Sequence, residues 1–257
     1  MGTSTSILIR VQARGGKFLG PDIGYSFITV RDVASGQLLA QSVGAGDSGQ
    51  LGTTLVPNAS TGVVFSAPET PNWLAATAGS PSPTAGFLAT FDLDAPALIE
   101  IAAAAMPNGV PSQQTTSARM WIWPGAQLVT EPGFVLEMAG LHVELLEPNP
   151  AQPPAAGQPI AITAWVTMMC GCKISDGSAW PVSEFAVTAS LVAPDGTIAA
   201  TSPLAIEVVN GKQVPSVFTG SLPFPATTGA YQLVIGAVQA SAANAGGTGL
   251  VLSLEAA

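Results

Sequence analysis

Short runs in which apolar and polar residues alternate recur along the whole chain and are separated by clusters of Gly, Pro, Asn and Asp. The most regular run, residues 87–94, places Phe87, Ala89, Phe91 and Leu93 on one side. A period of two is that of a strand with one buried face. No stretch combines an apolar stripe of helical period with capping residues at its ends. The pattern therefore predicts an all-β protein.

The distribution of these runs predicts two β-sandwich modules, residues 1–139 and 140–257. In the first module the predicted strands are residues 7–13, 25–31, 37–42, 62–66, 87–93, 98–104, 118–123 and 134–138. In the second module they are residues 141–146, 160–168, 184–192, 204–209, 214–221, 230–238 and 249–254. Seven short strands with turn signals between them predict an immunoglobulin-like sandwich for the second module.

Three segments resemble parts of known modules. Residues 229–235 (GAYQLVI) resemble the start of the penultimate strand of bacterial immunoglobulin-like modules, in which a tyrosine hydroxyl binds back to the chain at a corner. Residues 243–249 (ANAGGTG) resemble the turn before the last strand. Residues 28–39 (ITVRDVASGQLL) are similar to the strand, turn and strand of carboxypeptidase-regulatory or transthyretin-like modules. These resemblances imply a fold and bring no catalytic residues with them.

The charge balance narrows the classes of partner. The chain contains seven Lys and Arg residues and sixteen Asp and Glu residues, which gives a net charge of −9. Such an acidic chain repels phosphate, so nucleic acid is not expected as a partner. No apolar stretch is long enough to span a bilayer, and the start lacks the basic and apolar regions of a signal peptide. The expected location is therefore the cytoplasm by default.

The chain offers no convincing catalytic set. Residues 44–49 fit the dinucleotide pattern G-x-G-x-x-G, but the residues that follow do not favour a helix, so a turn is expected there. Residues 46–49 (GDSG) resemble the nucleophile segment of trypsin-like proteases, whose histidine base lies earlier in the chain. The only histidine, His142, lies far downstream, and strand alternation predicts it exposed beside Glu144. Enzymatic activity is therefore the third hypothesis, behind binding and metal or thiol chemistry.

One segment concentrates sulfur. Met168, Met169, Cys170 and Cys172 supply two thioethers and two thiols, the soft ligands that select Cu(I). If the preceding strand continues, Cys170 enters the core; if it ends near Gly171, both thiols lie in a loop. Three interpretations stay open: an inert packed thiol pair, a Cu(I) site made by these four residues, and a reversible disulfide, which would be strained across a single residue.

The C-terminal part of the second module is uncharged. Residues 213–254 contain no Asp, Glu, Lys, Arg or His, although three predicted strands there must turn alternate residues outward. Exposed strands usually carry charges that prevent pairing with other chains. We therefore expect a partner surface, for a second copy or another protein, with Gln232 and Gln239 pointing outward. The leading hypothesis is a non-catalytic binding or structural subunit of a larger protein assembly; the alternative is a Cu(I)-binding or thiol-redox protein.

Overall fold

The computed structural model describes residues 2–20, 25–44, 50–51, 63–64, 85–106, 114–130, 132–149, 154, 158–223, 225, 227 and 229–254. In these residues the regular structure consists of strands and two short 3-10 helices, η3 (Val182–Glu184) and η4 (Ala240–Ala242). The prediction of an all-β protein is confirmed. Within the described ranges, no helix has the length and apolar character needed to cross a membrane.

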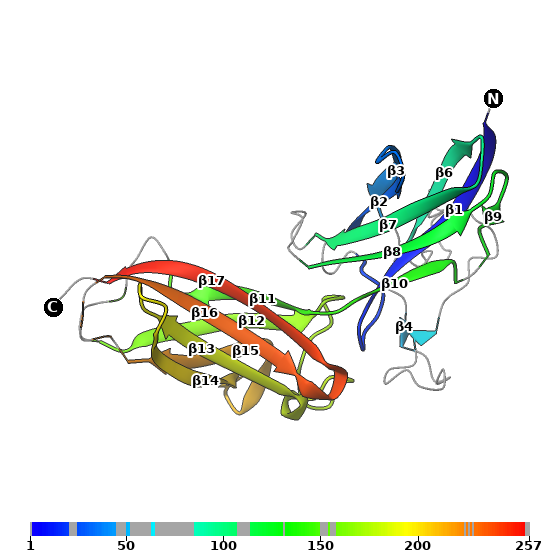
Figure 1. Cartoon of the computed structure of the whole chain (residues 1–257). Coiled ribbons are helices and arrows are strands. Elements are labelled where there is room, and N and C mark those ends of the chain that lie inside the picture. Colours follow the sequence, from blue (N-terminus) through cyan, green and yellow to red (C-terminus); the bar gives the residue numbers. More distant parts are fainter. Residues whose placement is uncertain are drawn as a thin grey trace. The chain divides into compact units, whose positions relative to one another are not determined.

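The chain divides into two compact units (Figure 1). Unit 1 comprises Met1–Ala139 together with the short segment Met169–Cys172. Unit 2 comprises Gly140–Met168 and Lys173–Ala257. Four residues that follow a strand of unit 2 thus pack as part of unit 1.

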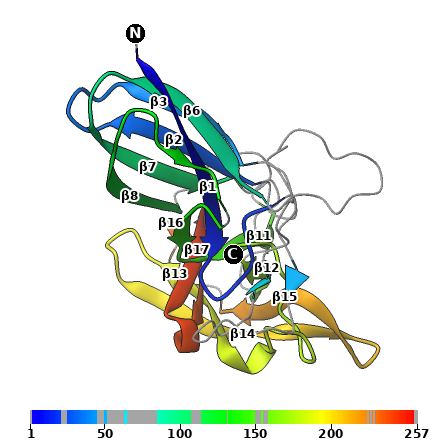
Figure 2. The same cartoon turned by 90° about the vertical axis from the view of Figure 1, so that its right-hand side faces the viewer.

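Unit 1 is a sandwich of two main sheets. Its strands are β1 (Thr3–Ala13), β2 (Ser26–Asp32), β3 (Leu38–Val43), β4 (Gln50–Leu51), β5 (Val63–Val64), β6 (Phe87–Leu93), β7 (Ala97–Ala105), β8 (Thr115–Ile122), β9 (Gln127–Leu128) and β10 (Phe134–Met138). One sheet has the order β10-β1-β6, with β9 also paired to β1, and the other has the order β3-β2-β7-β8. Figure 2 shows these two layers. The short strands β4 and β5 pair with each other.

The inner faces of unit 1 follow the alternation seen in the sequence. In β7, Ile99, Ile101 and Ala103 are buried and alternate with partly exposed residues. The central strand β1 is buried on both of its faces from Thr5 to Val11, and Gln12 is partly exposed. It pairs in parallel with β10 and antiparallel with β6. β1 therefore connects the beginning and the end of unit 1.

Unit 2 has the strand order of an immunoglobulin-like sandwich. Its strands are β11 (Leu141–Glu147), β12 (Ile160–Met168), β13 (Phe185–Val192), β14 (Ile198–Val209), β15 (Lys212–Leu222), β16 (Gly229–Gln239) and β17 (Asn244–Leu254). One ladder runs β11-β12-β15-β14 and the other runs β14-β13-β16-β17. These orders correspond to strands A-B-E-D and C-F-G of the immunoglobulin fold. The predicted architecture of two β-sandwich modules, the second immunoglobulin-like, is thereby confirmed.

β14 takes part in both ladders of unit 2. Its first part, as far as Leu204, pairs with β13. Its second part, from Ala205 to Val209, pairs with β15. The sequence pattern predicts this strand at residues 204–209 only, which is wrong at its start. Residues 198–203 mix Ala, Thr, Ser and Pro, and their strand conformation comes from pairing with β13 rather than from apolar alternation.

A tyrosine corner is present where β16 begins. Tyr231 is buried, and its hydroxyl donates a hydrogen bond of 3.1 Å to the carbonyl oxygen of Thr227. The same hydroxyl lies 2.6 Å from the Thr227 Oγ1. This is the corner that the segment 229–235 was expected to form, and it fixes the entry into β16.

The glycine-rich segment before the last strand is not a turn. Asn244 to Gly249 form the first half of β17, and only Ala243, with φ of 50°, has the left-handed conformation of a turn residue. Gly246 packs against the backbone of Leu141 in β11, and a Cβ atom there would overlap the Leu141 carbonyl group. Glycine is required in this segment by the close approach of two strands, which the sequence pattern did not distinguish from a turn.

Candidate functional site

The sulfur-rich segment follows the end of a regular strand. Alternate residues of β12 from Ile160 to Met168 are buried, as in a strand with one apolar face. The strand ends at Met168, and Gly171 has φ of 80°, a turn conformation that favours glycine. The prediction that the strand ends before Gly171 is correct. Burial nevertheless continues past it, because Met169 and Cys170 are shielded from solvent.

Cys170 lies in a packed polar environment within unit 1. Its Sγ lies beside Gly16, where a Cβ atom would come within 3.1 Å of the sulfur. Cys170 and Cys172 are both reduced thiols, Cys170 buried and Cys172 partly exposed. The side chain of Cys172 forms a hydrogen bond with the Cys170 sulfur, and the backbone N–H of Lys17 donates another.

These contacts lower the pKa of the Cys170 thiol to about 7. The hydrogen bond from the Cys172 side chain is the largest cause, and burial opposes it. The backbone N–H groups of Lys17 and Cys172 and the positive charge of Lys17 lower the pKa further. These contacts therefore favour the thiolate of Cys170, and thiolate is the reactive form of cysteine.

The predicted metal ligands are brought together only in part. Cys170 and Cys172 share a hydrogen bond, whereas Met168 belongs to the buried face of β12 in unit 2. Among the residues that the structure describes, no group of three or more His, Cys, Asp or Glu side chains could hold a metal ion. Cu(I) binding by the two thiols, with Met168 or Met169 as a further ligand, stays a prediction.

His142 is less exposed than the strand pattern indicated. Its side chain is only 12% exposed, because the ring of Trp165 on the neighbouring strand β12 packs edge-on against it with 5.5 Å between centroids. Burial lowers the pKa of His142, and the charge of Glu144 opposes this effect. The expectation of an exposed histidine is wrong because strand alternation does not reveal a large side chain on the adjacent strand.

We expect the lowered pKa of His142 to make unit 2 less stable in mild acid. The unfolded chain binds a proton at this histidine at a higher pH than the folded chain does. Stability contributed by neutral His142 is therefore lost as the pH falls below about 6.5. Chemical unfolding at pH 7.5 and 5.5 should show a smaller loss of stability for His142→Gln than for the wild type. An equal loss in both proteins would contradict this prediction.

An uncharged face covers the outer side of β13, β16 and β17. These three strands lie side by side in unit 2 (Figure 1). The outward positions of β16 and β17, which face the same side in the antiparallel register, are Ala230, Gln232, Val234, Gly236, Val238, Ala245, Gly247, Gly249, Val251 and Ser253. The outward positions of β13 are Ala186, Thr188, Ser190 and Val192. We call these residues the uncharged face.

The uncharged face has no side chains at two paired positions. Gly236 and Gly247 lie directly opposite each other near its middle, and a Cβ atom at Gly236 would meet no atom within 4 Å. Gln232 is exposed on this face, as the sequence predicted. Gln239 is not: it is 4% exposed, donates a hydrogen bond to Glu184 and accepts one from Asn244. The outward placement of Gln239 is therefore corrected, because these polar partners satisfy it inside the sandwich.

Unit 1 presents a different surface on the strand at the edge of one sheet. Trp121 and Trp123, at the end of β8 and just beyond it, are each 59% exposed. Arg119 lies on the same side of β8 and forms an ion pair with Glu100 at 2.8 Å. Exposed tryptophans are frequent in binding surfaces. Here they lie on the same side of β8 as Arg119, whose charge is already paired with Glu100.

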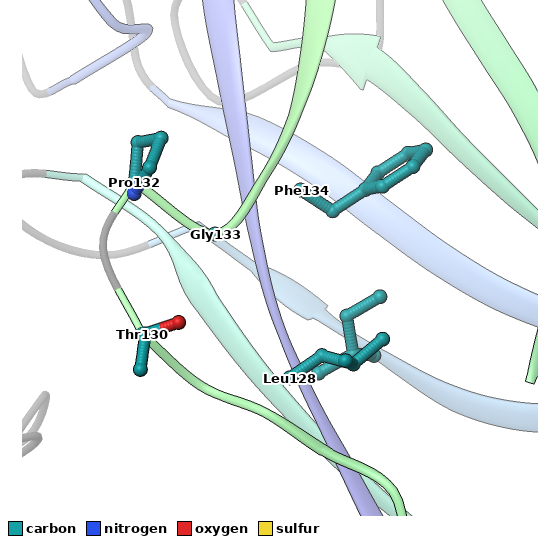
Figure 3. Close-up of a pocket in the computed structure, with 6 residues that line it drawn as sticks. Leu128, Thr130, Pro132, Gly133 and Phe134 are labelled. Carbon is teal, nitrogen blue, oxygen red and sulfur yellow. The ribbon is translucent and has the colours of Figure 1, made fainter. Parts of the chain in front are cut away.

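A small depression lies where β9 and β10 approach β1. Its volume is about 270 Å³, and its lining residues are Ile7, Leu128, Thr130, Pro132, Gly133 and Phe134. Figure 3 shows Leu128 and Phe134 on one side of β1 and Thr130 and Pro132 on the other. None of these six residues has an ionisable side chain, so the depression contains no group for acid–base catalysis.

Comparisons with known proteins add little to this description. No protein-family model matches the sequence, and no curated protein matches it either. Fibronectin(III)-like modules of Clostridium thermocellum CbhA align with 92% of this chain and 81% of their own, at 12% identity and a TM-score of 0.29. A TM-score this low supports no argument, so the architecture rests on the sheet orders.

Proposed function

We propose that this protein is a non-catalytic binding or structural subunit of a larger assembly, and that the uncharged face of unit 2 binds a second copy of the chain. The observation that supports the proposal is the lack of any ionisable side chain at the outward positions of β13, β16 and β17. We also propose that unit 1 is a carboxypeptidase-regulatory or transthyretin-like module and unit 2 a bacterial immunoglobulin-like one. The segments that carry these resemblances contain no catalytic residues.

The charge distribution favours a second copy as the partner. The chain carries a net charge of −9, so two copies repel each other over most of their surfaces. At the uncharged face, two copies can meet without removing any charged group from water, which is the most expensive part of burying polar surface. A strongly charged partner would find no complementary charge here.

The size of the uncharged face suits a weak, reversible dimer. β16 and β17 each contain 11 residues. At about 3.3 Å per residue and about 4.8 Å between strands, the three strands of the uncharged face cover roughly 36 by 14 Å, or about 500 Å². A stable interface of standard size buries about 800 Å² on each partner, and weak or transient interfaces bury less. A twofold contact between two such faces therefore has the size of a weak, reversible interface.

A lysine at Gln232 should weaken this association. Gln232 is exposed and lies opposite Val251, three residues from the start of β16. In a twofold dimer, Gln232→Lys would bury an unpaired charge from each copy, and we expect the dissociation constant to rise by about tenfold or more. Sedimentation equilibrium over a range of concentrations would measure this.

The matched control is Ser221→Lys. Ser221 is exposed on β15, which belongs to the other ladder of unit 2, so the same charge is added outside the uncharged face. We expect this variant to associate as the wild type does. A wild-type chain that stays monomeric at high concentration would contradict self-association and would leave another protein as the partner of the face.

A further inference from the structure

The two cysteines differ in accessibility although they share a hydrogen bond. Cys170 is fully buried and Cys172 is partly exposed, and one glycine in a turn conformation separates them. The backbone N–H of Lys17 and the side chain of Cys172 both point to the Cys170 sulfur. The segment thus places the thiol of a partly exposed cysteine directly beside a buried thiol.

We propose that Cys170 and Cys172 form a redox site at which small disulfides such as oxidised glutathione convert the dithiol into an intramolecular disulfide, with Cys172 reacting first and Cys170 second. Burial decides the order of the two steps. Cys172 is partly exposed to solvent, whereas Cys170 is fully buried and its sulfur lies beside Gly16.

In the first step, Cys172 loses its S–H proton to solvent and the resulting thiolate attacks one sulfur of the external disulfide. The external S–S bond breaks, one molecule of glutathione leaves as thiolate, and the other stays joined to Cys172 as a mixed disulfide. In the second step, the thiolate of Cys170 attacks the Cys172 sulfur. The second glutathione leaves as thiolate, and the bond between Cys170 and Cys172 forms. The protein loses two electrons and two protons, and one disulfide is reduced to two thiols.

The surroundings of Cys170 suit its attack on the Cys172 sulfur in the second step. Its neighbour Cys172 donates a hydrogen bond to it in the reduced state, so the two sulfurs are already adjacent. The backbone N–H groups of Lys17 and Cys172 also point to the Cys170 sulfur and hold it in place.

Single serine variants separate the two steps. The full chain, reduced and then exposed to oxidised glutathione, would be quenched with acid and its intact mass and thiol content measured. The wild type should lose both thiols and retain no glutathione. Cys170→Ser should accumulate one glutathione adduct, because the resolving thiol is missing. Cys172→Ser should keep its thiol, because the remaining sulfur is buried.

Two results would overturn the proposal. One is adduct formation at least as fast in Cys172→Ser as in Cys170→Ser, which would show that Cys170 is the accessible thiol. The other is a wild type that retains its thiols or accumulates the glutathione adduct without forming the internal disulfide. Circular dichroism of each variant checks that the β fold is intact, so that exposure by unfolding is recognised.

Discussion

Gly246→Ala is expected to destabilise unit 2 by about 3 kcal/mol. A methyl group on Gly246 would overlap the carbonyl oxygen of Leu141 and would lie 2.8 Å from its carbonyl carbon. These are backbone atoms, so the contact cannot be relieved by a side-chain rotation. Either β11 or β17 has to move, and Leu141, a fully buried residue, would move with it.

Gly236→Ala is the control for this prediction. Gly236 lies on β16, opposite Gly247 of β17, and the added methyl group would meet no atom within 4 Å. The chemical change is the same, and the expected change in stability is within about 0.5 kcal/mol. Chemical unfolding followed by circular dichroism, with hydrogen exchange of peptides from β11 and β17, would locate the effect. Equal stability of the two variants would mean that the strands are not in close contact.

The sequence predicts strand bounds correctly where an alternating run is followed by residues that disfavour a strand. The predicted bounds of β6, β10 and β12 agree with the structure, because each alternating run is followed by Asp, Ala-Gly or a glycine turn. It failed where a neighbouring strand, and not the local pattern, determines the conformation. Residues 198–203 join β14 by pairing with β13, and the glycines at the start of β17 serve a close contact and not a turn.

The candidate site was also predicted from the sequence only in part. The sequence identified Cys170 and Cys172 by their chemistry and predicted that the strand ends before them. It contained no sign that Lys17, far earlier in the chain, donates a hydrogen bond to the Cys170 sulfur. Contacts between distant segments set both the pKa of Cys170 and the burial of His142 by Trp165. The predicted segments 62–66 and 44–49 lie mostly outside the described residues.

Tyr231→Ala is expected to cost unit 2 about 3 to 5 kcal/mol, because it removes a buried aromatic ring and leaves a cavity. Tyr231→Phe should cost only about 1 to 2 kcal/mol, since it keeps the ring and removes the hydrogen bonds to Thr227. The difference in stability between the two variants separates the contribution of the packed ring from that of the hydrogen bonds to Thr227. Urea unfolding of the three proteins would measure both values, and a neutral Tyr231→Phe would show that the hydroxyl contributes nothing to the corner.

The pairing of β1 has a consequence for protein synthesis. β1 contains residues 3–13 and pairs with β10 at residues 134–138, and unit 1 also contains residues 169–172. During translation at about 5 to 20 residues per second, β1 therefore waits roughly 6 to 25 s before β10 has been made. In that interval its apolar residues lack their final partner, which is a state prone to aggregation. A ribosome-bound chaperone that covers this first strand would improve the yield of folded protein.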